Sequence, residues 1–340
     1  MKRILYIGNK LQNKTSNLSS IHILGRLLEG EGYQLYYAST KTNKVLRLLD
    51  MIFTFFKYSR TVDVVIIDTY STHNFYYAFI ISQLCRLFKV DYICSLNGGN
   101  LPARLKAHPK MSALVFKNSI SNVSPSKYLK HNFEQYGYNN IVHVPNTLEI
   151  ENYVLIEKEF SSPKLLWVRS FSKIYNPQLA VKVLKSLKTS YPDAELCMVG
   201  PDSDGSLKQV ETLAKKYNLN VKFTGKLTKK EWISLSKDYN IFINTTNFDN
   251  TPVSVIEGMA LGLPIVSTNV GGMPFLINNG KDGILVEPKD VDKMVKAIIY
   301  VLNNKSKRQE IIKNARLRAE QFDWKNIKKL WFKILDKEHG

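Results

Sequence analysis

The chain has 340 residues, of which 44% are hydrophobic, and this length and composition predict two ordinary globular domains. Lysine and arginine number 48 against 29 aspartates and glutamates, which gives a formal net charge of +19. Both halves of the sequence share the excess, which excludes a basic tail and favours anionic partners: phosphate-bearing small molecules, polyanions or anionic membrane surfaces.

The cysteines and the N-terminus indicate the compartment. Cys85, Cys94 and Cys197 lie in apolar runs without metal-site spacing, so we expect reduced, buried thiols in a cytoplasmic protein and no metal. The opening residues, MKRILYIGN, are too short an apolar run for a signal peptide or a spanning helix. We therefore expect a protein that is cytoplasmic, either soluble or peripheral at the inner membrane face.

The first elements alternate between strand and helix. Residues 3–7 predict a buried strand, residues 18–28 an amphipathic helix and residues 35–38 a second strand, which is the start of a doubly wound domain. The polar loop before the helix contains Thr15 and Ser16, which either donate to a ligand or belong to an ordinary loop and helix cap.

Residues 45–56, VLRLLDMIFTFF, predict a helix between basic residues that include Lys44, Arg47 and Lys57. Apolar side chains cover more than one face of this helix. It therefore either packs inside the domain or lies in a membrane interface, and we favour burial.

Two further expected strands, residues 62–68 and 92–96, are each followed by a segment that we assign to acceptor binding. Polar and aromatic side chains follow the first strand, and NGGNLPARLK follows the second. A glycine pair lets the backbone approach a ligand closely, and the cations Arg104 and Lys106 follow it. The candidate acceptor-side residues are His73, Asn97, Gly98 and Gly99, together with Thr15 and Ser16.

The remaining elements also alternate. A polar segment, residues 149–162, precedes the second domain, and regular strand–helix repetition then predicts a second parallel sheet with helices on both faces. The expected strands cover residues 120–124, 141–146, 164–168, 195–200, 221–224, 241–243 and 283–286, and the expected helices residues 126–136, 177–189, 207–218, 229–237, 253–261 and 291–302.

The stretch after residues 241–243 predicts a phosphate site. Thr251 is expected to cap a helix with Pro252 in the first helical position, and the N–H groups of a helix N-terminus attract phosphate. Asp249 precedes this helix and Glu257 lies within it. Carboxylates on both sides of a diphosphate suit a sugar nucleotide, with hydroxyls on its ribose and on its sugar.

The segment 249–272, DNTPVSVIEGMALGLPIVSTNVGG, resembles the signature of family 4 glycosyltransferases. These are retaining enzymes of the GT-B fold. The resemblance implies an α/β fold with two doubly wound Rossmann-like domains facing a central cleft. An N-terminal acceptor-side domain would span residues 1–150 and be joined by the C-terminal helix 325–340, and a donor-binding domain would span residues 151–324.

The resemblance also implies roles. Glu257 would bind ribose hydroxyls, Asp249 a hydroxyl of the transferred sugar, and Arg169 the leaving diphosphate, with Lys173 as a second cation. The further donor-binding candidates are Asn250, Thr251, Pro252, Val253, Gly200 and Gly225.

Three positions depart from the family pattern. Asp249 replaces the commoner Glu, Asn97 stands where members often place a His, and Tyr175-Asn176 stands nearest the usual Lys-Gly pair. A His role is therefore not carried over to Asn97.

We expect a retaining transfer from a UDP- or GDP-sugar to a glycan or lipid-linked acceptor, in surface polysaccharide synthesis, without a further cofactor. Nucleic-acid binding would fit the charge, but no binding motif accompanies it. Two alternatives stay open: a sugar-nucleotide epimerase or hydrolase of the same fold, and a non-catalytic sugar-nucleotide-binding partner subunit.

Overall fold

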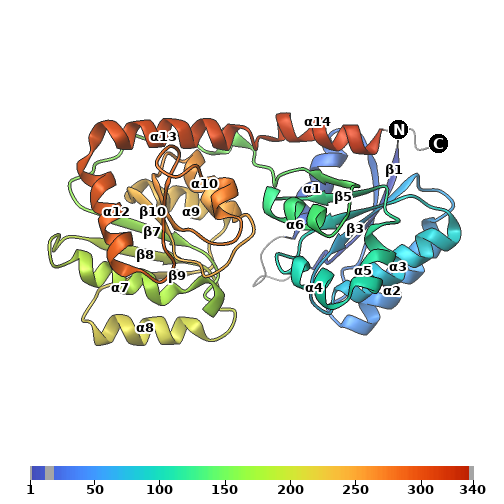
Figure 1. Ribbon diagram of the computed structural model, residues 1–340, viewed down its shortest axis with the longest axis horizontal. Helices are drawn as coiled ribbons and strands as arrows, with labels where there is room; N and C mark the ends of the chain where they lie inside the picture. Colours follow the sequence, from blue (N-terminus) through green and yellow to red (C-terminus); the bar gives the residue numbers. More distant parts are fainter. Residues whose placement is uncertain (1, 12–18, 337–340) are drawn as a thin grey trace. The chain divides into compact units, whose positions relative to one another are not determined.

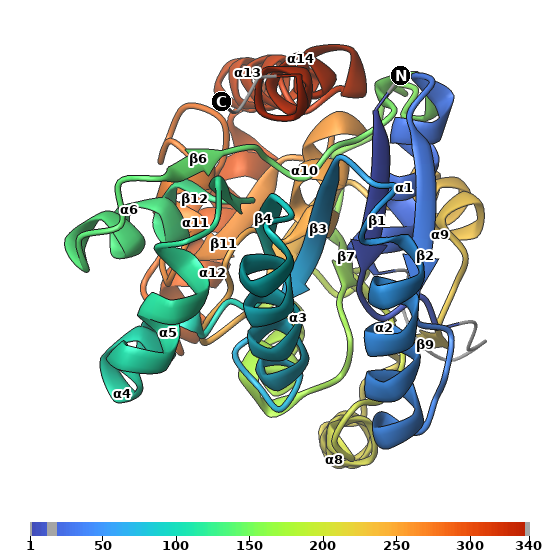
Figure 2. The same ribbon diagram turned by 90° about the vertical axis from the view of Figure 1, so that its right-hand side faces the viewer.

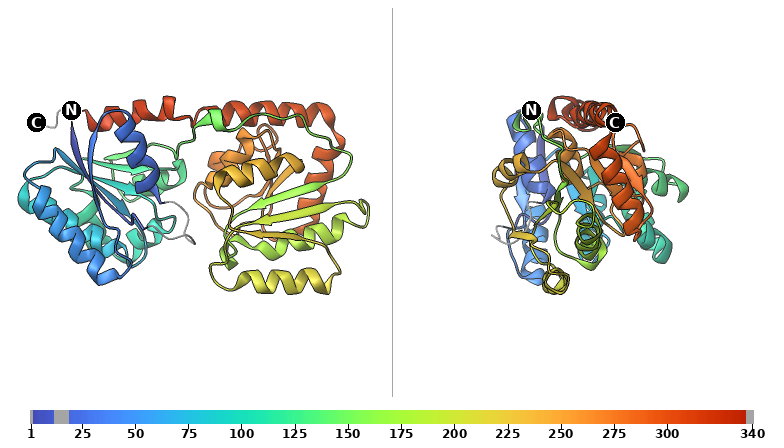
Figure 3. Two further views of the ribbon diagram at one scale, coloured as in Figure 1. Left: turned by 180° about the vertical axis from the view of Figure 1, so that it is seen from behind. Right: turned by 90° about the vertical axis from the view of Figure 1, so that its left-hand side faces the viewer.

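The computed structural model describes residues 2–11 and 19–336, and it contains two six-stranded parallel sheets with helices around them (Figures 1, 2 and 3). The chain forms two compact units: Met1–Pro145 with Ile327–Gly340, and Asn146–Asn326.

The N-terminal unit is built on a sheet with the strand order β2-β1-β3-β4-β5-β6. Its strands are β1 (Arg3–Ile7), β2 (Gln34–Ala38), β3 (Val64–Thr69), β4 (Tyr92–Leu96), β5 (Ser121–Ser124) and β6 (Ile141–His143). Strands β1, β3 and β4 are apolar runs buried on both faces, as parallel strands under helices require.

The described helices of the N-terminal unit are six that lie between its strands and one that comes from the C-terminal end of the chain. They are α1 (Ser20–Gly30), α2 (Lys44–Tyr58), α3 (Phe75–Phe88), α4 (Leu101–Ala107), α5 (Pro109–Phe116), α6 (Lys127–Gln135) and α14 (Trp324–Leu335). Lys328 of α14 pairs with Glu31 at 3.0 Å, and the Tyr33 hydroxyl donates to Asp336 at 2.9 Å. These contacts join the last helix to the start of the chain.

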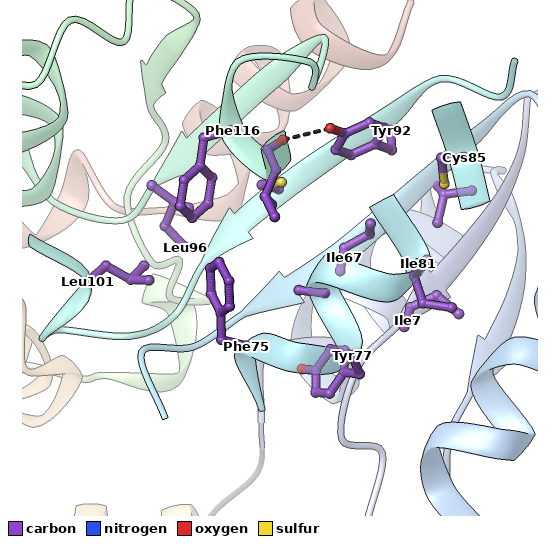
Figure 4. Packing of buried hydrophobic residues seen from close by; sticks show 14 of the residues in the cluster. Ile7, Ile67, Phe75, Tyr77, Ile81, Cys85, Tyr92, Leu96, Leu101 and Phe116 are labelled. Atoms are coloured by element: carbon purple, nitrogen blue, oxygen red, sulfur yellow. Dashed lines mark hydrogen bonds between the residues drawn. The ribbon is translucent and has the colours of Figure 1, made fainter. Parts of the chain in front are cut away.

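Helices α2 to α6 pack against one face of the N-terminal sheet. Phe75 of α3 meets Phe116 of α5 edge-on, with ring centroids 6.1 Å apart, and Leu96 and Leu101 lie beside them (Figure 4). The Tyr92 hydroxyl, whose hydrogen bond is dashed in the same view, donates to the Val115 carbonyl at 2.6 Å. A buried phenol is tolerated here because it has a hydrogen-bond partner.

The C-terminal unit has the strand order β12-β11-β10-β7-β8-β9. Its strands are β7 (Lys164–Val168), β8 (Glu195–Val199), β9 (Lys222–Gly225), β10 (Ile241–Asn244), β11 (Ile265–Thr268) and β12 (Ile284–Val286). Successive residues of β7 point to opposite faces. Leu165 and Trp167 belong to one core cluster, and Leu166 belongs to the other.

Helices cover both faces of this second sheet. One core cluster contains residues of α7, α8 and α12. The other contains residues of α9, α10, α11 and α13. The helices are α7 (Pro177–Leu187), α8 (Ser206–Lys216), α9 (Lys229–Leu235), α10 (Val253–Ala260), α11 (Met273–Leu276), α12 (Val291–Asn303) and α13 (Lys305–Glu320), and short 3-10 turns cover Ile150–Asn152, Lys173–Tyr175 and Ser236–Asp238.

The preference for burying the helix at residues 45–56 was wrong for much of its surface. Met51 and Phe55 are buried, but Leu49 is 56% and Phe53 is 72% exposed. Arg47, one of the basic residues around this helix, is buried, and its guanidinium donates to the Asn9 side chain and the Thr42 carbonyl. One stripe of α2 therefore packs on the sheet and another faces solvent.

The described part of the chain contains neither a cluster of metal-binding side chains nor a helix that could span a membrane. Residues 2–11 and 19–336 contain no group of three or more histidine, cysteine or acidic side chains that could hold a metal ion. Over the same residues, every helix is too short or too polar to span a bilayer.

Candidate functional site

The candidate site lies where the strand order of the second sheet reverses. From β7 the chain adds strands in one direction, and from β10 it adds them in the other, while β7 and β10 are neighbours. In open α/β sheets, ligands bind outside the carboxyl ends of the strands at such a switch point. Arg169 follows β7 here, and the loop of Asp249 follows β10.

The loop after β10 is held by a set of buried hydroxyl groups. Trp167 donates its indole N–H to the Thr245 hydroxyl at 3.0 Å, and that hydroxyl donates to the Tyr175 carbonyl. The Thr246 hydroxyl donates to the Phe248 carbonyl at 2.7 Å. Such side-chain to backbone bonds replace a regular ladder and fix the loop in one conformation.

The glycine pair at the end of the segment 249–272 packs against the same loop. The N–H of Gly272 donates to the Asp249 carbonyl at 2.9 Å. A Cβ atom on Gly272 would lie 1.6 Å from the Asn250 carbonyl oxygen, and Gly271 has a φ of +54°. Only glycine allows this approach, so Gly271 and Gly272 set the position of Asp249 and Asn250.

Arg169 and Asp249 meet at the switch point. A terminal guanidinium nitrogen of Arg169 lies 2.5 Å from Oδ2 of Asp249, whose side chain is only 8% exposed. The guanidinium also stacks over the ring of Tyr175 at 4.2 Å. Burial raises the pKa of Asp249, and the Arg169 charge opposes that rise.

This pair leaves polar atoms for a ligand. The buried Nε of Arg169 has no hydrogen-bond partner among the described residues. The buried Oδ2 of Asp249 has none either, although a terminal nitrogen of the Arg169 guanidinium forms the ion pair with it. The buried Oδ1 of Asn247, in the same loop, has none either. Buried polar atoms of this kind are rare in native proteins and cost free energy unless something binds them.

The N-cap of helix α10 lies one residue later than the sequence predicts. Thr251 does not cap it: Pro252 is the N-cap residue and Val253 the first helical one. A proline N-cap offers no side-chain oxygen, so the first N–H groups stay available. Those of Val253 and Ser254 have no hydrogen-bond acceptor among the described residues.

Glu257 is buried further along α10. Its Oε1 atom accepts a hydrogen bond from the Tyr153 hydroxyl at 2.7 Å and lies 2.5 Å from the Lys229 ammonium. Burial beside this carboxylate raises the pKa of Tyr153. The Tyr153 hydrogen bond and the shortest Lys229 contact are both to Oε1, and Oε2 accepts no hydrogen bond among the described residues.

Tyr153 and Lys229, the partners of Glu257, are each held in place by further contacts. Arg316 of α13 donates to the Tyr153 and Ala260 carbonyls, which ties the Tyr153 segment to α10. Thr228 and Glu231 form a capping box that starts α9 at Lys229. Sequence reasoning missed Tyr153 and Lys229, and no local pattern could have shown them.

Comparison with known proteins decides the family of this unit. Residues 156–318 match the family described as glycosyl transferases group 1. A sulfoquinovosyl transferase from Arabidopsis thaliana is 31% identical over 150 residues, covering 43% of this chain and 28% of the plant protein.

Solved structures extend the comparison to the whole chain. A sucrose-phosphate synthase from Thermosynechococcus elongatus matches with a TM-score of 0.83 and 16% identity, covering 99% of this chain and 100% of that one. HepE from Anabaena, solved with UDP and glucose, matches with a TM-score of 0.79, 15% identity and the same coverage.

The C-terminal unit is a group 1 glycosyl transferase domain. The chain as a whole has the two-unit α/β architecture of GT-B proteins, as the resemblance implied. The chain spans less than a third of its Arabidopsis relative.

The group 1 domain has a tyrosine near the expected lysine position. Asn176 has a φ of 46°, the left-handed conformation that glycine adopts most readily, and Tyr175-Asn176 stands nearest the usual Lys-Gly pair of the resembled family. Lys173 is exposed, and its backbone N–H donates to Asp204 at 2.9 Å. Its ammonium group has no ion-pair partner in the part of the chain that the structure describes.

Gly200 and Gly225 join neighbouring strand ends of the group 1 domain. The Gly200 N–H donates to the Gly225 carbonyl at 2.9 Å. A Cβ atom on Gly200 would lie 1.9 Å from the Arg169 carbonyl oxygen. Gly200 therefore allows the close approach of the Arg169 backbone.

The N-terminal unit places its candidates at the corresponding edge of its own sheet. Asn97 donates to Oδ1 of buried Asp68 at 2.7 Å and accepts from the Ser20 hydroxyl at 2.7 Å. Tyr6 also donates to Asp68. The Asn97 amide is therefore occupied by hydrogen bonds within the unit.

The other acceptor-side candidates differ in how the structure constrains them. A Cβ atom on Gly98 would lie 2.5 Å from the Ser71 backbone nitrogen, so glycine is needed there. Gly99 lies in the turn before α4, and His73 is exposed in the turn before α3. Thr15 and Ser16 lie outside the described residues.

Proposed function

We propose that this chain is a retaining glycosyltransferase that moves a sugar from a nucleoside diphosphate to a hydroxyl group of a glycan or lipid-linked acceptor. The observation that carries the proposal is the set of polar groups at the switch point of the group 1 domain that have no hydrogen-bond partner among the described residues. Arg169 Nε and the N–H groups of Val253 and Ser254 supply donors, and Asp249 Oδ2 supplies an acceptor.

The donors suit a diphosphate. A guanidinium binds phosphate oxygens through its planar array of N–H groups, and the N-terminus of α10 adds backbone N–H groups and a favourable dipole. Stacking on Tyr175 and the ion pair with Asp249 hold Arg169 in place. The guanidinium is thus oriented before the phosphate binds, which reduces the entropic cost of binding.

The acceptors suit the two sets of hydroxyl groups on a sugar nucleotide. Glu257 keeps Oε2 for the ribose while Tyr153 and Lys229 hold Oε1. Asp249 is assigned to a hydroxyl of the transferred sugar through its Oδ2 atom. The complexes of HepE with UDP and with UDP-glucose support a uridine nucleotide as the first donor to test.

The transfer step requires no dedicated base. The bond from the sugar's anomeric carbon to the diphosphate oxygen breaks, and a bond to the acceptor oxygen forms on the same face. The acceptor proton passes to an oxygen of the leaving phosphate. Arg169 and the α10 N–H groups stabilise the negative charge that grows on the diphosphate, which is where preorganised donors contribute most.

Release of nucleoside diphosphate tests the proposal. Uridine, guanosine and adenosine diphosphate sugars would first be ranked by thermal shift, and the best donor incubated with and without a panel of glycan and lipid-linked acceptors. The proposal expects release that depends on an acceptor and a product with the anomeric configuration of the donor.

Other outcomes of this experiment identify the alternatives. Release without any acceptor would indicate a hydrolase, and conversion of the donor sugar without release would indicate an epimerase. Tight donor binding with no turnover for any acceptor would favour a non-catalytic binding subunit.

A further inference from the structure

Helix α2 exposes an apolar stripe. Leu46, Leu49, Phe53 and Phe56 recur at spacings of three and four residues, so they lie on one side of the helix. Between 50% and 72% of each side chain is exposed. The buried residues Met51 and Phe55 face the sheet instead, so this stripe is not used by the fold of the described chain.

The end of α3 enlarges this stripe. Helices α2 and α3 lie side by side, as Figure 2 shows, and the rings of Phe56 and Phe88 meet edge-on with centroids 5.4 Å apart. Phe88 is 42% and Leu87 is 75% exposed. We call Leu46, Leu49, Phe53, Phe56, Leu87 and Phe88 the α2–α3 surface.

Cations border the α2–α3 surface. The five exposed basic residues on α2, α3 and the turns that follow them are Lys44, Lys57, Arg60, Arg86 and Lys89. Asp50 is the one acidic residue within α2 and α3. Large apolar side chains inside a basic border are typical of surfaces that lie in the interface of an anionic bilayer.

We propose that the α2–α3 surface docks on an anionic lipid bilayer, with its leucine and phenylalanine side chains in the headgroup–acyl boundary and its lysines and arginines on lipid phosphates. A second copy of the chain is a poorer occupant, because two such surfaces would bring like charges together in a protein of net charge +19. The inference does not depend on the proposed transfer reaction.

Vesicle co-sedimentation with the full chain tests the proposal. Phosphatidylcholine vesicles would be compared with vesicles that also contain phosphatidylglycerol, at low salt and at 0.5 M salt. We expect binding to the anionic vesicles at low salt and release at high salt, because screening at such ionic strength confines attraction to a few ångströms. A wild type that ignores anionic vesicles at low salt would overturn the proposal.

Two variants separate the apolar and basic contributions. Leu49→Ser/Phe53→Ser should weaken binding to anionic vesicles about tenfold or more. Lys57→Gln/Arg60→Gln/Lys89→Gln should weaken it about fivefold for each lost cation. Unchanged binding by the serine variant would overturn the proposal, since the apolar side chains would then lie outside the bilayer.

Matched controls come from the group 1 domain. Lys208→Gln/Lys215→Gln/Lys216→Gln removes the same charge from exposed positions of α8, and Leu317→Ser changes a leucine that is 51% exposed on α13. Both should bind vesicles like the wild type. An equal loss in the α8 variant would assign binding to net charge and overturn the α2–α3 assignment.

Sedimentation velocity without lipid tests whether a second copy of the chain covers the α2–α3 surface. Concentration-dependent dimers that disappear in Leu49→Ser/Phe53→Ser, together with no vesicle binding, would make the surface a contact between copies and overturn the proposal. Circular dichroism and Tm of each variant establish that it is folded before binding is compared.

Discussion

Arg169 and Asp249 come from loops after neighbouring strands and meet at 2.5 Å, with Arg169 stacked on Tyr175. Their contact places a cation assigned to phosphate beside a carboxylate assigned to a sugar hydroxyl. The bond that breaks in the proposed transfer joins those two parts of the donor. If both assignments are right, the reacting bond of the donor lies beside this pair.

Arg169→Ala should reduce turnover by about 10²–10³, as removal of an oriented donor to a developing oxyanion does in other enzymes. Steady-state kinetics with the best donor measure this. The same change leaves the buried Asp249 charge without its partner, at a cost to the free energy of unfolding of roughly 1–3 kcal/mol. Wild-type turnover in this variant would remove Arg169 from the site.

A double variant separates stability from catalysis. Arg169→Ala/Asp249→Asn removes both charges, so it should regain much of the lost stability. Its turnover should stay as low as that of Arg169→Ala or lower. If turnover returned together with Tm, the role of Arg169 would be structural.

Asp249→Asn should lower kcat more than it lowers nucleoside diphosphate affinity, because Asp249 is assigned to the sugar. Burial raises the pKa of Asp249. If kcat requires the ionised form, its acid limb should lie at higher pH than an exposed aspartate would give. The asparagine variant should lack that limb. Equal losses in kcat and affinity would instead indicate a loop-supporting role.

Glu257→Ala should weaken nucleoside diphosphate binding by about 1.5–3 kcal/mol, since a charged acceptor of the ribose hydroxyls is lost. Tyr153→Phe should cost less, about 0.5–1.5 kcal/mol, because it only removes the bond to Oε1. Calorimetry measures both. Unchanged affinity in Glu257→Ala would contradict the ribose assignment.

Asp68 should make the stability of the N-terminal unit depend on pH. Burial raises its pKa from 3.8 to about 7. Between these values the folded state holds more protons than the unfolded state. The contribution of Asp68 is then complete below about pH 4 and is lost as pH rises through 7, with a slope of at most about 1.4 kcal/mol per pH unit.

Denaturant unfolding of the wild type and Asp68→Asn across this range checks the slope. Asparagine keeps an oxygen for the Tyr6 and Asn97 donors. It should therefore gain stability relative to the wild type as pH rises from 4 to 7. Parallel curves for the two proteins would mean that Asp68 titrates alike in the folded and unfolded states.

Strands were the elements that the sequence predicted best. Strands β4 and β7 have the predicted bounds, Tyr92–Leu96 and Lys164–Val168. Continuous apolar runs between polar turns identify buried parallel strands. Helix α3 was not predicted, because its apolar and aromatic residues cover most of its circumference and give no clear 3.6-residue period.

The candidate site was predictable only where a local sequence pattern marks its residues. The spacing of Asp249 and Glu257 around one helix start follows from the motif, and Arg169 from the end of a strand. Tyr153 and Lys229 reach Glu257 through contacts between distant segments, which local patterns do not encode. The Thr251 cap was wrong, since Thr251 precedes the proline N-cap.

A crystal structure of the protein with a bound nucleoside diphosphate tests the central claim most directly. The account predicts phosphate oxygens within hydrogen-bond distance of the Arg169 guanidinium and the Val253 and Ser254 N–H groups, with the ribose hydroxyls on Glu257. A nucleotide bound elsewhere, or a diphosphate that contacts neither Arg169 nor the start of α10, would contradict it.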